Sequence, residues 1–250
     1  MTNQLPPLPN SVVEEESSGT TIFARRWPLF AAVATVALLV GHAIVVGGPP
    51  PDVNATGPQV VAYYREHGDA IRVSLWLATI AMLPFIPLVG WLRRQVRGIG
   101  RDVLLLGAAA YAIEATVWQW TSGGLALHPD QLDAHTARTL LDITAYVGPM
   151  LTSAVILLAA PIGWASLRHD NSAPSWFGWL TVVLVVEQAV ETVTVLGTSG
   201  FIAPGGPMNF PLGAGLFMVW VIACGAVFPA DSVARVPAAD DREPREPGSS

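Results

Sequence analysis

The sequence predicts an all-α integral membrane protein, a bundle of six transmembrane helices with both termini in the cytoplasm. Of the 250 residues, 52% are hydrophobic and only 13% are charged, against about a quarter charged in soluble domains. The uncharged stretches are long enough for helices that cross a hydrocarbon core about 30 Å thick. They also lack the alternation of polar and apolar residues that barrel strands show.

The chain divides into two polar tails and a membrane domain. Residues 1–24, rich in Pro, Ser and Glu, and residues 230–250 are predicted to be disordered cytoplasmic tails. The membrane domain covers residues 25–229. Its six spans lie at about 27–47, 73–92, 103–122, 143–165, 176–197 and 211–228.

Local sequence features mark the ends and irregularities of these spans. The Gly-Gly-Pro-Pro-Pro run at residues 47–51 ends the first span. Pro84 and Pro87 predict a bend in the second, and Pro149 and Pro161 interrupt the fourth. The third and fifth spans carry acidic residues, and the sixth is the shortest.

Two of the outer loops show helix signals. Thr56-Gly57-Pro58-Gln59 resembles a capping box with Pro in the first turn. An apolar face that includes Val60 and Tyr64 follows it, so we expect a short interfacial helix on the outer leaflet. The second loop is predicted to enter the fourth span as a helix capped near Asp130.

The arginines predict the orientation, because cytoplasmic loops carry an excess of basic residues. All 13 basic residues are Arg. With the N-terminus inside, ten of them lie on the cytoplasmic side. Arg65, Arg72 and Arg138 alone lie outside.

Four short sequence segments together resemble those of a known group of proteins. They are Tyr-Tyr-Arg-Glu-His at 63–67, Trp-Leu-Arg-Arg at 91–94, Leu-Leu-Asp at 140–142 and Pro-Ser-Trp-Phe-Gly-Trp at 174–179. On these, the chain resembles actinobacterial multi-pass membrane proteins of a domain-of-unknown-function family over roughly residues 25 to 228. The resemblance implies the six-span topology and a cell (cytoplasmic) membrane location. It implies no activity and no residue role.

Three carboxylates inside the spans are the most informative feature for function. Glu114 and Glu187 each lie about eleven residues from the cytoplasmic end of their span, and Glu191 lies one turn further out. An acid at this depth is costly in lipid, so it tends to face the bundle interior with partners. We therefore expect a polar seam between the third and fifth spans.

Helical spacing adds neighbours to these acids. The predicted ligand- or proton-binding residues are Glu114, Glu187, Glu191, Tyr111, Gln188, Thr194, Asp142 and Tyr146. Glu187 and Glu191 repel each other when both are ionised, so at least one is expected to hold a proton.

Two functional hypotheses follow from this seam. In the first, the protein binds or transports a small polar or protonatable ligand there. In the second, it is an accessory subunit or assembly factor of a membrane complex, and its polar seam packs against the helices of a partner. A wet cavity at the acids would favour the first hypothesis, and a dry, closed seam would favour packing.

No motif in the sequence predicts catalysis, a metal or a cofactor. There is no Gly-x-Ser-x-Gly, phosphate loop or His-Glu-x-x-His. The single cysteine, Cys224, excludes an intramolecular disulfide, and His42 is the one His within a span. The lipid bilayer is the expected partner, with a membrane-protein partner or a homo-oligomer left open. Nothing predicts nucleic-acid binding.

Overall fold

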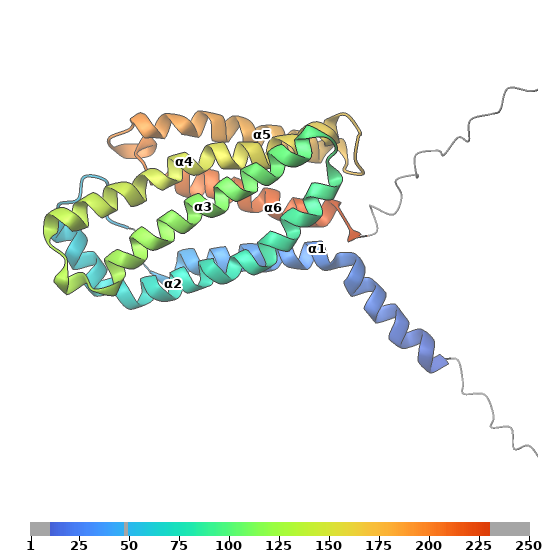
Figure 1. Cartoon of the computed structure of the whole chain (residues 1–250), viewed down its shortest axis with the longest axis horizontal. Coiled ribbons are helices and arrows are strands. Elements are labelled where there is room, and N and C mark those ends of the chain that lie inside the picture. The colour runs from blue at the N-terminus through green and yellow to red at the C-terminus, as the bar shows by residue number, and fades with distance from the viewer. Residues whose placement is uncertain (1–10, 48–49, 231–250) are drawn as a thin grey trace, which may run out of the picture.

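The computed structural model describes residues 11–47 and 50–230, and Figure 1 shows an antiparallel helical bundle. Within these residues, six helices are long and apolar enough to cross a membrane, and no strand occurs. The predicted all-α, six-span fold class is therefore confirmed. The long helices are α1 (Ser11–Val45), α2 (Gly57–Leu92), α3 (Ile99–Leu127), α4 (Ala134–Leu167), α5 (Ser175–Glu191) and α6 (Gly215–Val227).

Shorter helical turns complete several of these helices. The last turn of the fifth span is the 3₁₀ helix η3 (Thr192–Leu196), and the sixth begins as the π-helix η5 (Met208–Ala214). The remaining turns are η1 (Arg93–Gln95), η2 (Pro129–Gln131) and η4 (Gly200–Ile202). Both α5 and α6 therefore change their helical geometry at the same end of the bundle.

Each long helix packs against its neighbours in the chain, and α6 returns to pack against α1. Helix α4 also contacts α2. Helices α3 and α5 both pack extensively against α4, and they lie on opposite sides of it (Figure 1).

Two contacts define the antiparallel register of α3 and α4. The Thr144 hydroxyl donates to the Thr121 hydroxyl at 3.0 Å. Near the other end, Gly107 lies against the backbone of Leu157 and Leu158, where a Cβ atom would overlap it. Small residues permit this close approach of two helices in a membrane.

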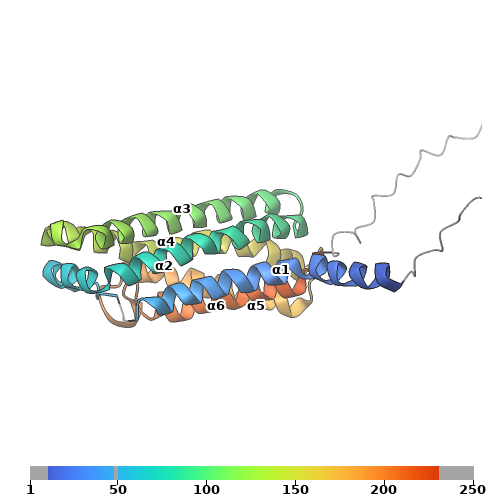
Figure 2. The same ribbon diagram turned by 90° about the horizontal axis from the view of Figure 1, so that it is seen from below.

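The bundle has two parts, which both views show (Figures 1 and 2). In the larger part, here called the six-helix layer, all six long helices lie side by side. Its core includes Phe85, Phe177 and Trp220. At one end, here called the distal end, α2, α3 and α4 continue past the other helices. Their own core there includes Val60, Tyr64 and Leu125.

At the distal ends of α2 and α4, the structure differs from two predictions. The expected interfacial helix does not form a separate helix, because residues 57–92 are one uninterrupted helix. Its predicted cap is present, since the Thr56 backbone N–H donates to Gln59 Oε1 at 2.8 Å. Its placement at a leaflet stays a prediction. Helix α4 is capped by Asp133 rather than near Asp130, which pairs with Arg65.

The structure also differs from the predicted N-terminal tail, because α1 begins at Ser11 and is helical through residue 24. Extending an existing helix adds one hydrogen bond for each residue ordered, and the Glu14–Glu16 run has good helix propensity. Residues 1–10 and, of the predicted C-terminal tail, residues 231–250 lie outside the described residues.

Candidate functional site

The predicted acidic residues form two separate groups instead of one seam. Glu114 lies on α3, whereas Glu187 and Glu191 lie on α5, and α4 packs between these helices. The register of α3 and α4 places Glu114 opposite the turn that contains Leu151. The expected direct seam between the third and fifth spans was wrong, because α4 occupies the space between them.

The first group surrounds the Glu191 carboxylate, which is buried, with 3% of the residue exposed. Gln188 Nε2 donates to Glu191 Oε2 at 2.6 Å, and Asn209 Nδ2 donates to Glu191 Oε1. The backbone of Gly213 lies so close that a Cβ atom would overlap the carboxylate. Both carboxylate oxygens therefore have amide donors, and the group is closely packed.

Glu187 shares a donor with Glu191. Gln188 Nε2 also donates to Glu187 Oε2 at 2.9 Å, whereas Glu187 Oε1 is buried with no hydrogen-bond partner among the described residues. One amide therefore bridges two carboxylates, which repel each other when both are ionised.

Asn209 and Thr194 connect this group to the irregular turns. Asn209 Nδ2 contacts Thr194 Oγ1 at 3.3 Å, and the Gly205 backbone N–H donates to Asn209 Oδ1 at 2.9 Å. These bonds join the end of α5 to the start of α6. The structure thus brings Glu187, Gln188, Glu191 and Thr194 together.

Sequence reasoning missed Asn209. Its only signal was a polar residue two positions before the predicted start of the sixth span.

The second group lines a groove of about 500 Å³ between α3 and α4, here called the α3–α4 groove. Three predicted residues, Glu114, Asp142 and Tyr146, line it together. The other lining residues are Val117, Thr139, Ile143, Val147 and Met150. Most of this surface is apolar, and the carboxylates are its charged groups.

Among the described residues of the groove, Glu114 differs because one of its carboxylate oxygens is buried without a hydrogen-bond partner. This oxygen is Oε2. Buried polar atoms are normally hydrogen-bonded, so an orphan of this kind calls for an explanation.

Asp142, by contrast, is paired with Arg138, one helical turn away. Arg138 Nη2 donates to Asp142 Oδ1 at 2.8 Å and Nε donates to Oδ2 at 3.3 Å. The same guanidinium donates to the backbone oxygens of Val53 and Ala55 in the loop before α2. The i, i+4 spacing was visible in the sequence, but the loop contacts were not.

Tyr111 was predicted to join Glu114, but it packs in the core of the six-helix layer. Its ring lies 5.5 Å from that of Phe85 and 5.3 Å from that of Phe217. It does not line the α3–α4 groove.

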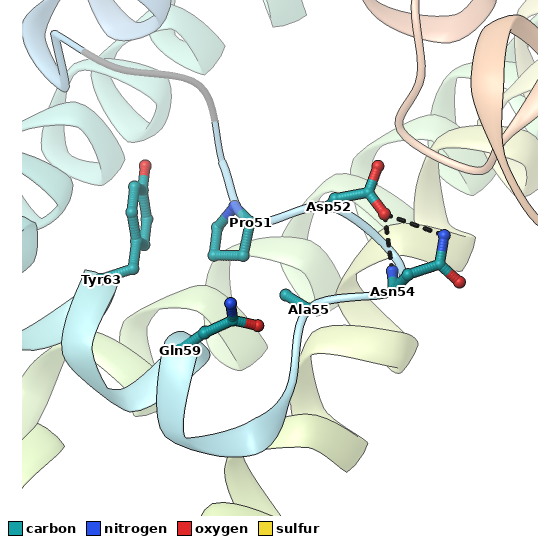
Figure 3. Close-up of a pocket in the computed structure, with 6 residues that line it drawn as sticks. All are labelled: Pro51, Asp52, Asn54, Ala55, Gln59 and Tyr63. Carbon is teal, nitrogen blue, oxygen red and sulfur yellow. Dashed lines mark hydrogen bonds between the residues drawn. The ribbon is translucent and has the colours of Figure 1, made fainter.

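A second hollow, of about 480 Å³, lies at the distal end (Figure 3). It is lined by Pro51, Asp52, Asn54 and Ala55 of the loop and by Gln59 and Tyr63 of α2. The Asp52 carboxylate already accepts two hydrogen bonds from Asn54.

Across the part of the chain that the structure describes, no three His, Cys, Asp or Glu side chains gather as they would around a metal ion. His42 contacts the Ser74 hydroxyl, and its ring lies edge-on to Trp118 at 5.1 Å. This arrangement packs α1 against α2 and α3.

The fold defines a multi-pass membrane protein whose apolar helices contact the lipid bilayer. Part of the chain is similar to the cytochrome c-type biogenesis protein CycK of Bradyrhizobium diazoefficiens, with 36% identity over 55 residues. The match covers 22% of this chain and 8% of CycK. No family model and no solved structure matches the chain. The resemblance to actinobacterial proteins stays a prediction.

Proposed function

We propose that this multi-pass membrane protein binds or transports a small polar or protonatable ligand, with the α3–α4 groove as its binding site. The observation that carries the proposal is the orphan Glu114 Oε2 in a groove of about 500 Å³. Ligand sites are typically concave and mostly apolar, with a few polar groups that orient the ligand. The Glu191 carboxylate, which is buried and accepts hydrogen bonds on both oxygens, serves helix packing in this proposal.

The cell membrane is the proposed location, with the distal end outside. This orientation rests on the arginine distribution. The groove then opens on the outer side of the bilayer.

The proposal is tested by ligand-dependent stabilisation of the purified protein in nanodiscs. A library of small amines, alcohols and acids is screened for compounds that raise the melting temperature. The isosteric Glu114→Gln variant is expected to abolish the shift, whereas Glu66→Gln, an exposed carboxylate on α2, is expected to retain it. A compound that stabilises wild type and Glu114→Gln equally would place its site elsewhere.

The likeness to CycK favours a second candidate function, an accessory subunit or assembly factor of a membrane complex. CycK is described as a cytochrome c-type biogenesis protein. This candidate predicts that a defined membrane protein co-purifies with the chain in mild detergent. The partner should be lost when Glu114 is replaced and retained with Glu66→Gln. Purification of the chain alone under these conditions would count against it.

A further inference from the structure

The position of the α3–α4 groove along the bundle restricts what can enter it. Helix α5 runs antiparallel to α4, with Gly163 against Thr181 and Gly178 against Leu167. The fifth span, Ser175–Leu196, is about 35 Å long, because its α-helical part rises about 1.5 Å per residue and its 3₁₀ turn about 2.0 Å. This length is close to the hydrocarbon thickness. Where η5 begins, Asn209 lies against Gly148 of α4, so the six-helix layer ends near that residue.

The groove straddles this boundary. Thr139, Asp142 and Ile143 lie on the distal side of Gly148, whereas Met150 lies on the membrane side. The register of α3 and α4 places Glu114 at the level of Met150 and Leu151. The groove therefore runs from the interfacial region of the bilayer into its apolar part.

The apolar end of the groove continues along an exposed face of α4. Tyr146, Met150 and Leu157 follow each other at helical spacing and are 45%, 46% and 43% exposed. Lipid is the solvent on this face, so a ligand with an apolar chain can lie along it without leaving the bilayer.

The charged residues of the groove determine which charge the polar group of that ligand should carry. Glu114 has an orphan oxygen, and Asp142 already shares the guanidinium of Arg138. Arg138 is also held by two loop carbonyls. No basic side chain lines the groove among the described residues, so a cation from outside is the complementary partner for Glu114.

Resting on the proposed function, we infer that the ligand of the α3–α4 groove is a cationic amphiphile that enters from the lipid. Its ammonium group binds Glu114, and its chain lies along Met150 and Leu157 of α4. A long-chain amine has both properties, whereas a small water-soluble cation lacks the chain.

The test uses the full chain in phosphatidylcholine nanodiscs with a dodecylamine that carries a diazirine at the chain end. Labelled residues are mapped by mass spectrometry. Unlabelled dodecylamine, dodecanol, dodecanoic acid and butylamine compete. We expect labelling of α4 near Leu157, with displacement by dodecylamine at concentrations at least about tenfold lower than by the other three.

Two variants test separately the charge of Glu114 and the shape of the groove. Glu114→Gln is expected to weaken labelling about tenfold, as the loss of one charged hydrogen bond would. Met150→Trp is expected to block the groove and abolish labelling with the charge unchanged. Glu66→Gln is the control, and unchanged melting temperatures verify folding.

The remaining outcomes distinguish the two proposals. Equal competition by butylamine, or equal competition by dodecanol with no effect of Glu114→Gln, overturns the cationic amphiphile but leaves a ligand-binding groove. Labelling that is spread over all lipid-facing helices and unaffected by Met150→Trp overturns the amphiphile site. If no compound of the wider library stabilises the protein through Glu114 either, the proposed function fails as well.

Discussion

Glu114 and Glu191 lie at similar levels of α4 but in different surroundings. Glu191 receives hydrogen bonds from Gln188 and Asn209, whereas Glu114 Oε2 receives none from the described residues. A buried acceptor without a donor costs about 1–3 kcal/mol. The two acids therefore differ: both oxygens of Glu191 accept hydrogen bonds within the fold, whereas one oxygen of Glu114 has no donor among the described residues.

Removing one of the two amide donors of Glu191 should destabilise the protein. Asn209→Ala leaves Glu191 Oε1 buried with no amide donor, and we expect a loss of about 1–3 kcal/mol in the free energy of unfolding. Thermal unfolding in detergent measures this as a lower melting temperature. Gln131→Ala, which removes an exposed amide at the distal end, is the control. An unchanged melting temperature for Asn209→Ala would show that this bond contributes nothing to stability.

Helix α4 organises the bundle, because it contacts α2, α3 and α5. Its contact with α3 depends on Gly107, which lets the two backbones approach closely. Its distal end is held by the Asp133 cap, which accepts from the Thr136 hydroxyl at 2.5 Å and from the Thr136 backbone N–H at 2.9 Å. The packing of α4 thus positions Asp142 and Tyr146 beside Glu114.

The close approach at Gly107 predicts a large difference between two glycines of α3. Gly107→Ala should separate α3 from α4, because its Cβ atom would overlap the backbone of Leu157 and Leu158, and should cost about 1–3 kcal/mol, as overpacking does. Gly124→Ala is the matched control, because a Cβ atom at Gly124 meets nothing within 4 Å and Ala favours the helix. Melting temperatures of both variants check this, and equal values would contradict the packing of α3 on α4.

The Asp133 cap predicts a dependence of stability on pH. Hydrogen bonds from the hydroxyl and the backbone N–H of Thr136 hold the pKa of the Asp133 carboxyl below its ordinary value. The cap therefore stabilises the protein above the ordinary Asp pKa of about 4. This contribution is lost as the pH falls through the lowered folded-state pKa.

Comparison with Asp133→Asn isolates this effect, because Asn can cap a helix but does not titrate in this range. The difference in melting temperature between wild type and Asp133→Asn should be larger at pH 6.5 than at pH 3.5. A difference that stays constant over this range would mean that the charge of Asp133 does not contribute.

The molecule as a whole is asymmetric along the membrane normal. Six helices form a layer about as thick as the hydrocarbon core, and α2, α3 and α4 continue beyond it at the distal end (Figure 1). The α3–α4 groove lies where these two parts meet. A ligand there would contact both lipid and the interfacial region.

The orientation of this asymmetry is testable with single introduced cysteines. Gln131→Cys lies at the distal end and Ser172→Cys at the opposite end, and both positions are exposed. The native Cys224 is buried, so its background labelling should be low. A membrane-impermeant maleimide on intact cells should label Gln131→Cys, and Ser172→Cys only after lysis. The reverse pattern would invert the proposed topology.

Much of the architecture was predictable from sequence because lipid imposes a simple requirement. A spanning segment must be apolar over about 20 residues and must satisfy its own backbone as a helix. Both conditions are local, so six spans follow from six apolar runs. The grouping of Glu187, Gln188 and Glu191 was predictable for the same reason, since residues three and four apart share a helix face.

The neighbours of each helix were not predictable in this way. They depend on how side chains from distant segments fit together, as Gly107 fits against Leu157 and Leu158. The contact of Asn209 with Glu191 and that of Arg138 with Val53 also join segments that are separate in the chain. Helical periodicity therefore identified the acids, whereas the packing of α4 between α3 and α5 divided them into a closed group and an open groove.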